Sequence, residues 1–331
     1  MSKFVLTLDS SQISDFLDCP TLWEYKNVKR LQPVSAGENV PMSMGSYGHK
    51  LLEIIYKCRA EGDGVSAIDQ AFNYDVDKLF CRCGHGKEHH NPHVLELDDT
   101  LEKYCTIVGC QCLDFVPVPF PLSAPNRERV KNRVLEYTFC EGTAFPTLVP
   151  KSPDHIEVGF SHKLYEDESR LYILEGRIDL LGKIASNCEN GWADHKFQIR
   201  ERDLYLKSIQ FRNYSMVTDL SIGVVNYIRF AQKIEKDKTF KREIISFSRV
   251  ELRNWEQQLI QIFNQVERFA KLEERRLWLS DTEIRNWGAC SGKYGYKCDY
   301  TGLCEASLVN QNLVQILEKQ DFKEKPIWKA W

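Results

Sequence analysis

The chain has 331 residues, of which 43% are hydrophobic, so it can form one large globular domain or two ordinary ones. Its 44 Lys and Arg residues nearly balance 47 Asp and Glu, and a net charge of −3 gives no sign of a protein that attracts nucleic acid over its whole surface. No apolar run reaches membrane-spanning length, and Phe4-Val5-Leu6 is too short for the core of a secretion signal. We therefore expect a cytoplasmic protein without membrane contacts, in which any DNA contact is a local patch.

The first 79 residues have a helical pattern that breaks at Cys19. Serines suited to helix capping precede the apolar residues Ile13 and Phe16, and the pattern restarts at Cys19-Pro20. This predicts two short helices on either side of Cys19. After a loop rich in Pro, Gly and Ser, the segment from Gly45 predicts an amphipathic helix with His49 in its first turn.

The composition changes between residues 80 and 125, where many of the 12 cysteines lie near histidines. A cytosolic protein seldom keeps so many thiols as disulfides, so metal binding is the better explanation. Paired Cys and His ligands allow a short segment without its own core to fold around zinc. We predict an inserted zinc module here, with surface thiols and histidines as the alternative, and the ligands we select are Cys83, His90, Cys105 and Cys110.

The rest of the chain alternates helical and strand patterns. A helix is predicted over 126–139, and three strands follow over 156–165, 170–184 and 191–197. The next elements are a helix over 203–219, strands over 224–232 and 240–248, and a long helix over 251–279. This order predicts an α/β fold. The chain has no Gly-x-x-x-x-Gly-Lys-[Ser/Thr] loop, which argues against a built-in helicase motor.

Two neighbouring predicted strands carry acidic residues and a lysine in a suggestive layout. Asp179 lies on the strand over 170–184, and Asp194 and Lys196 lie on the next one. Period-2 alternation places Asp194 and Lys196 on the same face, with His195 on the other. Such oxygen ligands can hold Mg²⁺ or Mn²⁺, and the lysine can position or help deprotonate a water. This is the layout of a metal-dependent phosphodiesterase site, although an isolated Asp-x-Lys is more often a solvated pair.

Further residues extend this layout. His49 follows a glycine pair, and Gln210 and Tyr214 lie four residues apart on one helix face. The ordered series resembles the RecB-type nucleases of the PD-(D/E)XK superfamily, over roughly residues 10–60 and 155–305. The motifs that carry the resemblance are Gly45-x-x-x-His49, Glu157, Gly176-Arg177-Ile178-Asp179, Asp194-x-Lys196 and Gln210-x-x-x-Tyr214.

The resemblance implies a restriction-endonuclease-like α/β core, with a central mixed sheet flanked by helices. It also implies that His49, Asp179 and Asp194 bind a divalent metal, with the backbone carbonyl of His195 as a further ligand. For His49, the alternative is a histidine satisfied within the core.

Four other positions receive roles from the same resemblance. Lys196 would act on the attacking water, and Gln210 and Tyr214 would orient the DNA or the active-site groups. Glu157 would have a supporting role. For Gln210, the alternative is a purely structural glutamine.

The segment Phe16-Leu17-Asp18-Cys19-Pro20-Thr21-Leu22-Trp23 resembles the N-terminal cysteine segment of the iron-sulfur branch of these nucleases, which includes AddB and the CRISPR-associated adaptation exonucleases. In that branch four cysteines hold a [4Fe-4S] cluster that joins the chain ends, and here they would be Cys19, Cys290, Cys298 and Cys304. The first C-terminal spacing is x7 where the family commonly has x2. Four thiolates also suit zinc, so the metal stays open between iron-sulfur, which the resemblance favours, and zinc.

Several basic residues near the second strand and the helix after it are candidates for sequence-independent contacts with DNA phosphates, namely Lys196, Arg200, Arg202, Lys207 and Arg212. Glu201 and Asp203 among them keep open the alternative of a solvated charged helix face.

These observations divide the chain into five parts. They are an N-terminal helical part of the nuclease domain (1–79), the zinc insert (80–125), the nuclease core (126–285), an iron-sulfur clasp (286–306) and a C-terminal tail (307–331). We expect a Mg²⁺- or Mn²⁺-dependent deoxyribonuclease, specifically a single-strand exonuclease in recombination, repair or phage and mobile-element DNA processing, with a separate helicase or recombination protein as a partner. The alternative is a non-catalytic DNA- or partner-binding module on a nuclease fold.

Overall fold

The structure is a computed structural model. It describes residues 3–34, 40–63, 66–73, 122–141, 148–150, 152–184, 189–198, 208–230, 239–274, 286–290, 298–309 and 311–324. No helix in these ranges is both long enough and apolar enough to cross a membrane.

The central element is the long strand β5 (Arg170–Ile184), with which four other strands pair. β1 (Phe4–Leu8) runs parallel to it, and β3 (Leu148–Val149), β4 (Ile156–Glu166) and β6 (Asn190–Gln198) run antiparallel. β7 (Ile222–Arg229) pairs in parallel with β6, and β8 (Phe240–Ser246) completes the seven-stranded mixed sheet. A short 3₁₀ turn, η4 (Pro153–His155), leads into β4.

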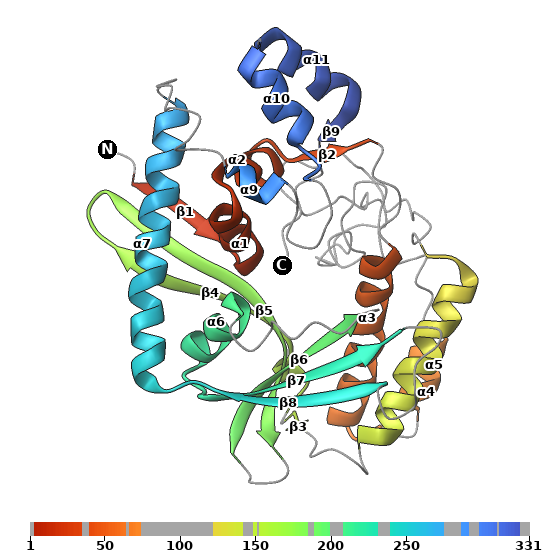
Figure 1. The fold of residues 1–331 in the computed structure, drawn as a ribbon. Helices are drawn as coiled ribbons and strands as arrows, with labels where there is room; N and C mark the ends of the chain where they lie inside the picture. Colours follow the sequence, from red (N-terminus) through yellow and green to blue (C-terminus); the bar gives the residue numbers. More distant parts are fainter. Residues whose placement is uncertain are drawn as a thin grey trace, which may run out of the picture.

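Helices cover both faces of this sheet (Figure 1). On one face, α3 (Val40–Ala60), α4 (Ala67–Phe72) and α5 (Ala124–Glu141) form a core with inward residues of β5, β6 and β7. On the other face lie α1 (Ser10–Asp18), α6 (Ile209–Thr218) and α7 (Arg249–Glu274). The α/β prediction with a central mixed sheet is confirmed, and the architecture is that of the restriction-endonuclease-like core.

A segment near the N-terminus, residues 20–33, and a segment near the C-terminus, residues 287–324, are joined outside the main sheet (Figure 1). The N-terminal part is α2 (Pro20–Trp23), a π-helical turn η1 (Glu24–Val28) and β2 (Leu31–Pro33). The C-terminal part is α9 (Trp287–Cys290), α10 (Thr301–Val309), α11 (Gln311–Asp321) and β9 (Phe322–Glu324). β2 pairs antiparallel with β9, Tyr25 stacks on Tyr300, and the Tyr300 hydroxyl donates to the Leu31 carbonyl at 2.7 Å.

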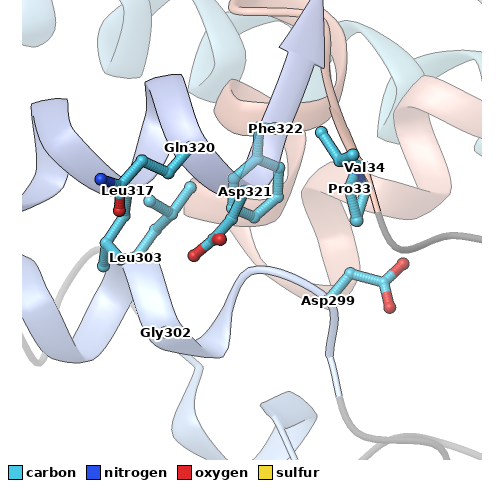
Figure 2. A pocket seen from close by; sticks show the side chains of 9 residues that line it. All are labelled: Pro33, Val34, Asp299, Gly302, Leu303, Leu317, Gln320, Asp321 and Phe322. Carbon is cyan, nitrogen blue, oxygen red and sulfur yellow. The ribbon is translucent and has the colours of Figure 1, made fainter.

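A cavity of about 460 Å³ lies within this joined region (Figure 2). It is bordered by the end of β2, the start of β9 and the facing sides of α10 and α11, with the carboxylates of Asp299 and Asp321 among mainly apolar side chains. None of the residues singled out for chemistry lines it. The cavity therefore belongs to the joined chain ends and not to the predicted site.

Most predicted elements are present with boundaries shifted by a few residues, and the helix break at Cys19 lies between α1 and α2 as predicted. β1 was not predicted, because its pairing with β5 is parallel and connects segments more than 160 residues apart. The predicted boundary at residue 306 falls inside α10, and the one at residue 125 falls inside the first turn of α5. The predicted tail over 307–331 contains α11 and β9.

Gly223 lets β7 approach the buried Trp192 on the neighbouring strand β6. A Cβ at this position would overlap the indole ring, which stacks on Phe211 and donates to the Ser215 hydroxyl at 2.8 Å. We predict that Gly223→Ala lowers the free energy of unfolding by about 1–3 kcal/mol, the usual cost of overpacking.

Urea denaturation measures this effect, and Gly302→Ala is the matched control. Gly302 lies in α10, where a Cβ would meet no atom of the described residues within 4 Å apart from its own helix backbone and chain neighbours, so the same substitution should leave stability unchanged or raise it by up to about 1 kcal/mol. An equal change in the free energy of unfolding for both variants would contradict the explanation that Gly223 makes room for the Trp192 ring.

Candidate metal-dependent active site

The strand β6 presents its functional residues on two faces, as predicted from period-2 alternation. Asp194, which is 1% exposed, and Lys196 face α6, and the Lys196 ammonium lies 2.8 Å from Asp194 Oδ2. The His195 side chain points to the opposite face, where its Nε2 lies 3.2 Å from the Tyr56 hydroxyl on α3. The carboxylate and the ammonium are therefore adjacent in one buried place.

The helix α6 supplies two partners for this pair. Gln210 accepts a hydrogen bond from Lys196 Nζ at 2.8 Å and donates to Asp194 Oδ1 at 3.2 Å. The Tyr214 hydroxyl, one turn further on, donates to the Arg177 carbonyl at 2.6 Å and lies 3.4 Å from Asp194 Oδ1. Both side chains thus hold Asp194 and Lys196 in fixed orientations.

Asp179 lies where the strands β4 and β5 change the faces they present. Ile178 packs with Trp192 and the residues of α6, whereas Leu180, two residues later, packs on the α3 face. In a regular strand, residues two apart share a face. Glu157, between the residues that pair with Ile178 and Leu180, has φ 54°, in the left-handed region that is uncommon for a residue with a side chain. The regular alternation is therefore interrupted at Glu157 and Asp179.

This interruption brings side chains from three elements together. Asp179 Oδ2 accepts the backbone N–H of His195 at 2.7 Å and lies 3.4 Å from His49 Nδ1 on α3. His49 Nδ1 is also 4.0 Å from Glu157 Oε1. Among the described residues, His49, Glu157 and Asp179 are the one group of three potential metal ligands whose donor atoms all lie within 4.8 Å of one another.

The position of His49 depends on a close approach of α3 to β6. A Cβ on the preceding residue, Gly48, would lie 2.6 Å from the Phe197 ring, which stacks on Phe230 at 5.3 Å. The imidazole of His49 meets the same Phe197 ring edge-on, with 5.0 Å between centroids. The glycine therefore allows the helix to deliver His49 to the carboxylates.

Burial of the carboxyl groups dominates the electrostatics of the site. It raises the pKa of Glu157 to about 8, with the Asp179 charge adding to the shift and Arg177 opposing it. Burial also raises the pKa of Asp194 to about 6, which Lys196 reduces and Asp179 increases. Without a further cation, the site disfavours full ionisation of these groups.

The pKa values of Asp179 and His49, whose nearest atoms lie 3.4 Å apart, are lowered instead of raised. Burial acts to raise the pKa of Asp179, but His49, His195 and Lys196 together hold it below its usual range. Burial lowers the pKa of His49 to about 4, although Asp179 opposes this shift, so the imidazole is neutral at neutral pH. An ionised carboxylate beside a neutral imidazole is the protonation state that metal coordination requires.

The donor set fits a divalent metal. Within the described part of the chain, neither Asp194 Oδ2 nor Glu157 Oε2 receives a hydrogen bond of good geometry, although Lys196 and Arg177 lie 2.8 and 2.7 Å away. Buried carboxylate oxygens with available lone pairs beside a neutral imidazole suit Mg²⁺ or Mn²⁺. Asp194 stands apart from the group of three, on the Lys196 side of the site.

Arg177 is a further candidate that sequence reasoning left without a role. It lies two residues before Asp179, its guanidinium is 2.7 Å from Glu157 Oε2, and its side chain is half exposed. A cation at the edge of a carboxylate cluster is positioned to meet a phosphate. The available signal was its place in the Gly176-Arg177-Ile178-Asp179 motif.

The four terminal cysteines gather where the chain ends meet. Burial raises the pKa of the Cys298 thiol, and the nearby Cys290 and Cys19 raise it further. The Cys298 amide donates to the Cys290 carbonyl at 3.0 Å, and Cys298 packs against the apolar cluster that contains Cys304. All four are reduced cysteines, and no three of their sulfur atoms lie within 4.8 Å of one another.

The structure does not bring every predicted residue to the site. Arg212 lies over the Trp255 ring of α7, 5.1 Å from its centroid, on the side of α6 opposite Gln210 and Tyr214. Three further basic candidates, Arg200, Arg202 and Lys207, lie outside the described residues, as do the selected zinc ligands Cys83, His90, Cys105 and Cys110.

The sheet and the helices on its two faces are those of the restriction-endonuclease-like nucleases. Residues 8–305 match the family model of the PD-(D/E)XK nuclease superfamily. The chain belongs to this superfamily.

Comparison with solved structures gives weak likenesses. The crystal structure of SSO0001 has 14% identity and a TM-score of 0.26, and the match covers 43% of this chain and 62% of that one. The crystal structure of a candidate exonuclease from Eubacterium rectale has 11% identity and a TM-score of 0.40, with 95% of this chain and 92% of that one covered. No curated protein matches the chain. Similarities at this level support no conclusion about activity.

The raised pKa values of Glu157 and Asp194 predict how the stability of the metal-free protein depends on pH. A group whose pKa is raised on folding contributes stability that is present below its unfolded pKa and is lost as pH rises through the folded one. For Glu157 this window runs from the ordinary value of 4.5 to about 8. In divalent-free buffer, thermal unfolding should therefore occur at lower temperature at pH 8 than at pH 5.

Glu157→Gln is the variant that tests this origin, because the amide cannot ionise. Its melting temperature should fall less between pH 5 and pH 8 than that of the wild type. Glu166→Gln, at an exposed carboxylate paired with Lys163 and Lys3, should keep the wild-type slope in this range, because its pKa lies below the range. If the melting temperature of Glu157→Gln fell with pH as steeply as that of the wild type, Glu157 would not be the origin of the pH dependence.

Proposed function

We propose that this protein is a Mg²⁺- or Mn²⁺-dependent deoxyribonuclease that hydrolyses phosphodiester bonds at the site formed by β5, β6, α3 and α6. The observation that carries the proposal is the convergence of His49, Glu157 and Asp179 beside the buried Asp194–Lys196 pair. Membership of a nuclease superfamily supports it.

The proposed metal ligands are His49, Asp179 and Asp194, with the backbone carbonyl of His195. When bound, a divalent metal would stabilise charge on the phosphate and lower the pKa of a water. Glu157 is a candidate fourth side chain, because its Oε1 lies 4.0 Å from His49 Nδ1.

Residues of the chain would carry out the other steps. Lys196 would orient the attacking water and offset phosphate charge, and Gln210 would hold the Lys196 ammonium at 2.8 Å in the required direction. Tyr214 would fix Asp194 from the other side. Arg177, at the exposed edge, would contact a phosphate oxygen of the substrate.

We further propose that the substrate is a single-stranded DNA end, as in the exonucleases that the sequence resembles, and that the protein acts in recombination, repair or the processing of phage and mobile-element DNA. A separate helicase or recombination protein is proposed as its partner.

We propose that Cys19, Cys290, Cys298 and Cys304 hold a [4Fe-4S] cluster. Four reduced cysteines lie at the junction of the chain ends, which Asn286 reinforces by donating to the Asp18 carbonyl at 3.0 Å. The effect of Cys290 and Cys19 on the pKa of the Cys298 thiol supports the closeness of these three side chains.

The segment over 80–125 is proposed to be a separate zinc module, on the basis of its clustered Cys and His residues. In this proposal the zinc module is separate from the nuclease core over 126–285 and from the cysteine clasp over 286–306.

The central prediction concerns cleavage. Wild-type protein with Mn²⁺ or Mg²⁺ should degrade end-labelled single-stranded DNA, and both Asp194→Asn and Lys196→Ala should reduce the rate by at least about 10²-fold, because each removes a group from water activation or metal binding. Polarity and strand preference follow from the labelled products on single- and double-stranded substrates.

Glu166→Gln and Lys163→Ala are matched controls, since they make the same charge changes in an exposed pair that is 2.8 Å apart. Both should retain wild-type rates. Cleavage that persists in both site variants would refute the site, and tight DNA binding without cleavage by the wild type would favour a non-catalytic binding module.

Metal content tests the two cysteine groups together. Protein purified without oxygen should be brown and contain iron, sulfide and zinc. Cys298→Ser should lose iron and keep zinc, whereas Cys83→Ser should lose zinc and keep iron, because the two sites are separate. Cys140→Ser, at a reduced cysteine on α5, should retain both. A colourless protein whose Cys298→Ser variant loses zinc would rule out the iron-sulfur cluster.

A further inference from the structure

The side chain of His195 lies behind the site, on the face of β6 that packs against α3 and α5. It is 2% exposed, and its Nδ1 lies 3.5 Å from Asp179 Oδ2. Its Nε2 faces the hydroxyls of Tyr56 and Tyr137 at 3.2 and 3.5 Å and the side-chain nitrogen of Asn226 at 3.3 Å. A buried imidazole thus links the carboxylate of Asp179 to three buried polar side chains on α3, α5 and β7.

The orientation of Asn226 is determined by Arg242. The Arg242 Nε donates to Asn226 Oδ1 at 2.5 Å, and a guanidinium can only donate. The oxygen of the Asn226 amide must therefore face Arg242, which turns its NH₂ group toward His195. Arg242 Nη2 also donates to the Tyr137 hydroxyl at 3.2 Å, so the proton of that hydroxyl is left to point elsewhere, including toward Nε2.

The tautomer of His195 follows from this chain of donors. Since the Asn226 nitrogen only donates, Nε2 is the accepting nitrogen, and the tautomer that fits this contact carries its proton on Nδ1. That N–H points to Asp179 Oδ2, which already receives the backbone N–H of the same residue at 2.7 Å. Two nitrogens of His195 thus face Asp179 Oδ2, the oxygen that lies 3.4 Å from His49 Nδ1.

We propose that His195 is a positioning residue that acts through its side chain, held as the Nδ1–H tautomer by Arg242 and Asn226, and that it orients the Asp179 carboxylate for a divalent cation. This role differs from that of its backbone carbonyl. Histidines and carboxylates that orient metal ligands in this way typically affect metal affinity or activity 10–100-fold.

The predicted effect of His195 on DNA cleavage rests on the proposed nuclease activity, whereas the tautomer of His195 can be tested without it. Nitrogen-15 NMR of protein labelled at histidine distinguishes a protonated Nδ1 from a protonated Nε2, and the resonance that disappears in His195→Asn identifies this residue among eight histidines. The expected result is protonation at Nδ1. In Asn226→Asp the new carboxylate accepts where the amide donated, so the proton should be found on Nε2.

Metal dependence supplies the functional readout. His195→Leu removes the donor to Asp179 and should raise the Mn²⁺ concentration for half-maximal cleavage about 10–100-fold, with a smaller change in the rate at saturating Mn²⁺. His195→Asn places an N–H near the position of Nδ1 and should restore most of the Mn²⁺ affinity. His162→Leu, a half-buried histidine on β4, should leave both quantities unchanged.

The outcomes separate this inference from the proposed function. A proton on Nε2 in the wild type, or unchanged Mn²⁺ dependence in His195→Leu, would overturn the role of His195 while Asp194→Asn still tests the nuclease. If the wild type does not cleave DNA but carries the His195 proton on Nδ1, the proposed function is refuted and the tautomer assignment stands. The effect of His195→Leu on Mn²⁺ affinity would then be measured by calorimetry instead of by cleavage.

Discussion

The constraint on which this site depends is the removal of three carboxyl groups from water at one place in the sheet. Burial raises the pKa of Glu157 and Asp194, whereas the cationic and N–H groups around Asp179 keep that carboxyl ionised. Lys196 and Arg177 offset part of this cost from opposite sides. A divalent cation would offset the rest, so the same desolvation that destabilises the metal-free protein favours metal binding. The surrounding helices act on this balance, with α6 orienting Asp194 and Lys196 and α3 supplying a neutral His49.

The geometry of the cluster originates in the backbone of β4 and β5. The left-handed φ of Glu157 and the change of face at Asp179 occur at the same register position, where β4 and β5 lie side by side. Non-glycine residues in this region are found where the surrounding structure enforces them, frequently at functional sites. Here the interruption allows a carboxylate from each strand to meet a helix that covers only one face of the sheet. The interior of β5 on either side of Asp179 is fixed by separate apolar clusters, around Ile178 and around Leu180, which hold the irregularity in place.

The sequence was sufficient to predict the α/β class and the shared face of Asp194 and Lys196, because these follow from local periodicity. Gln210 and Tyr214 were predictable as a pair for the same reason, being one helical turn apart. The closeness of Glu157 to His49 and Asp179 depends on a backbone conformation that no residue pattern indicates. The network behind His195 joins residues from α3, α5, β7 and β8, and pairings over such separations in the chain leave no local signal. Charge alone also did not reveal that the side of α6 that carries Arg212 packs against Trp255.

Together, these buried groups are expected to form one cation site. Crystals soaked in Mn²⁺ and measured near the manganese absorption edge would test this most directly, because anomalous scattering locates the ion independently of catalysis. The predicted result is a manganese peak bonded to His49, Asp179 and Asp194, with Lys196 beside it and His195 oriented behind Asp179. Full occupancy of manganese at other residues, with none at these carboxylates, would contradict the account.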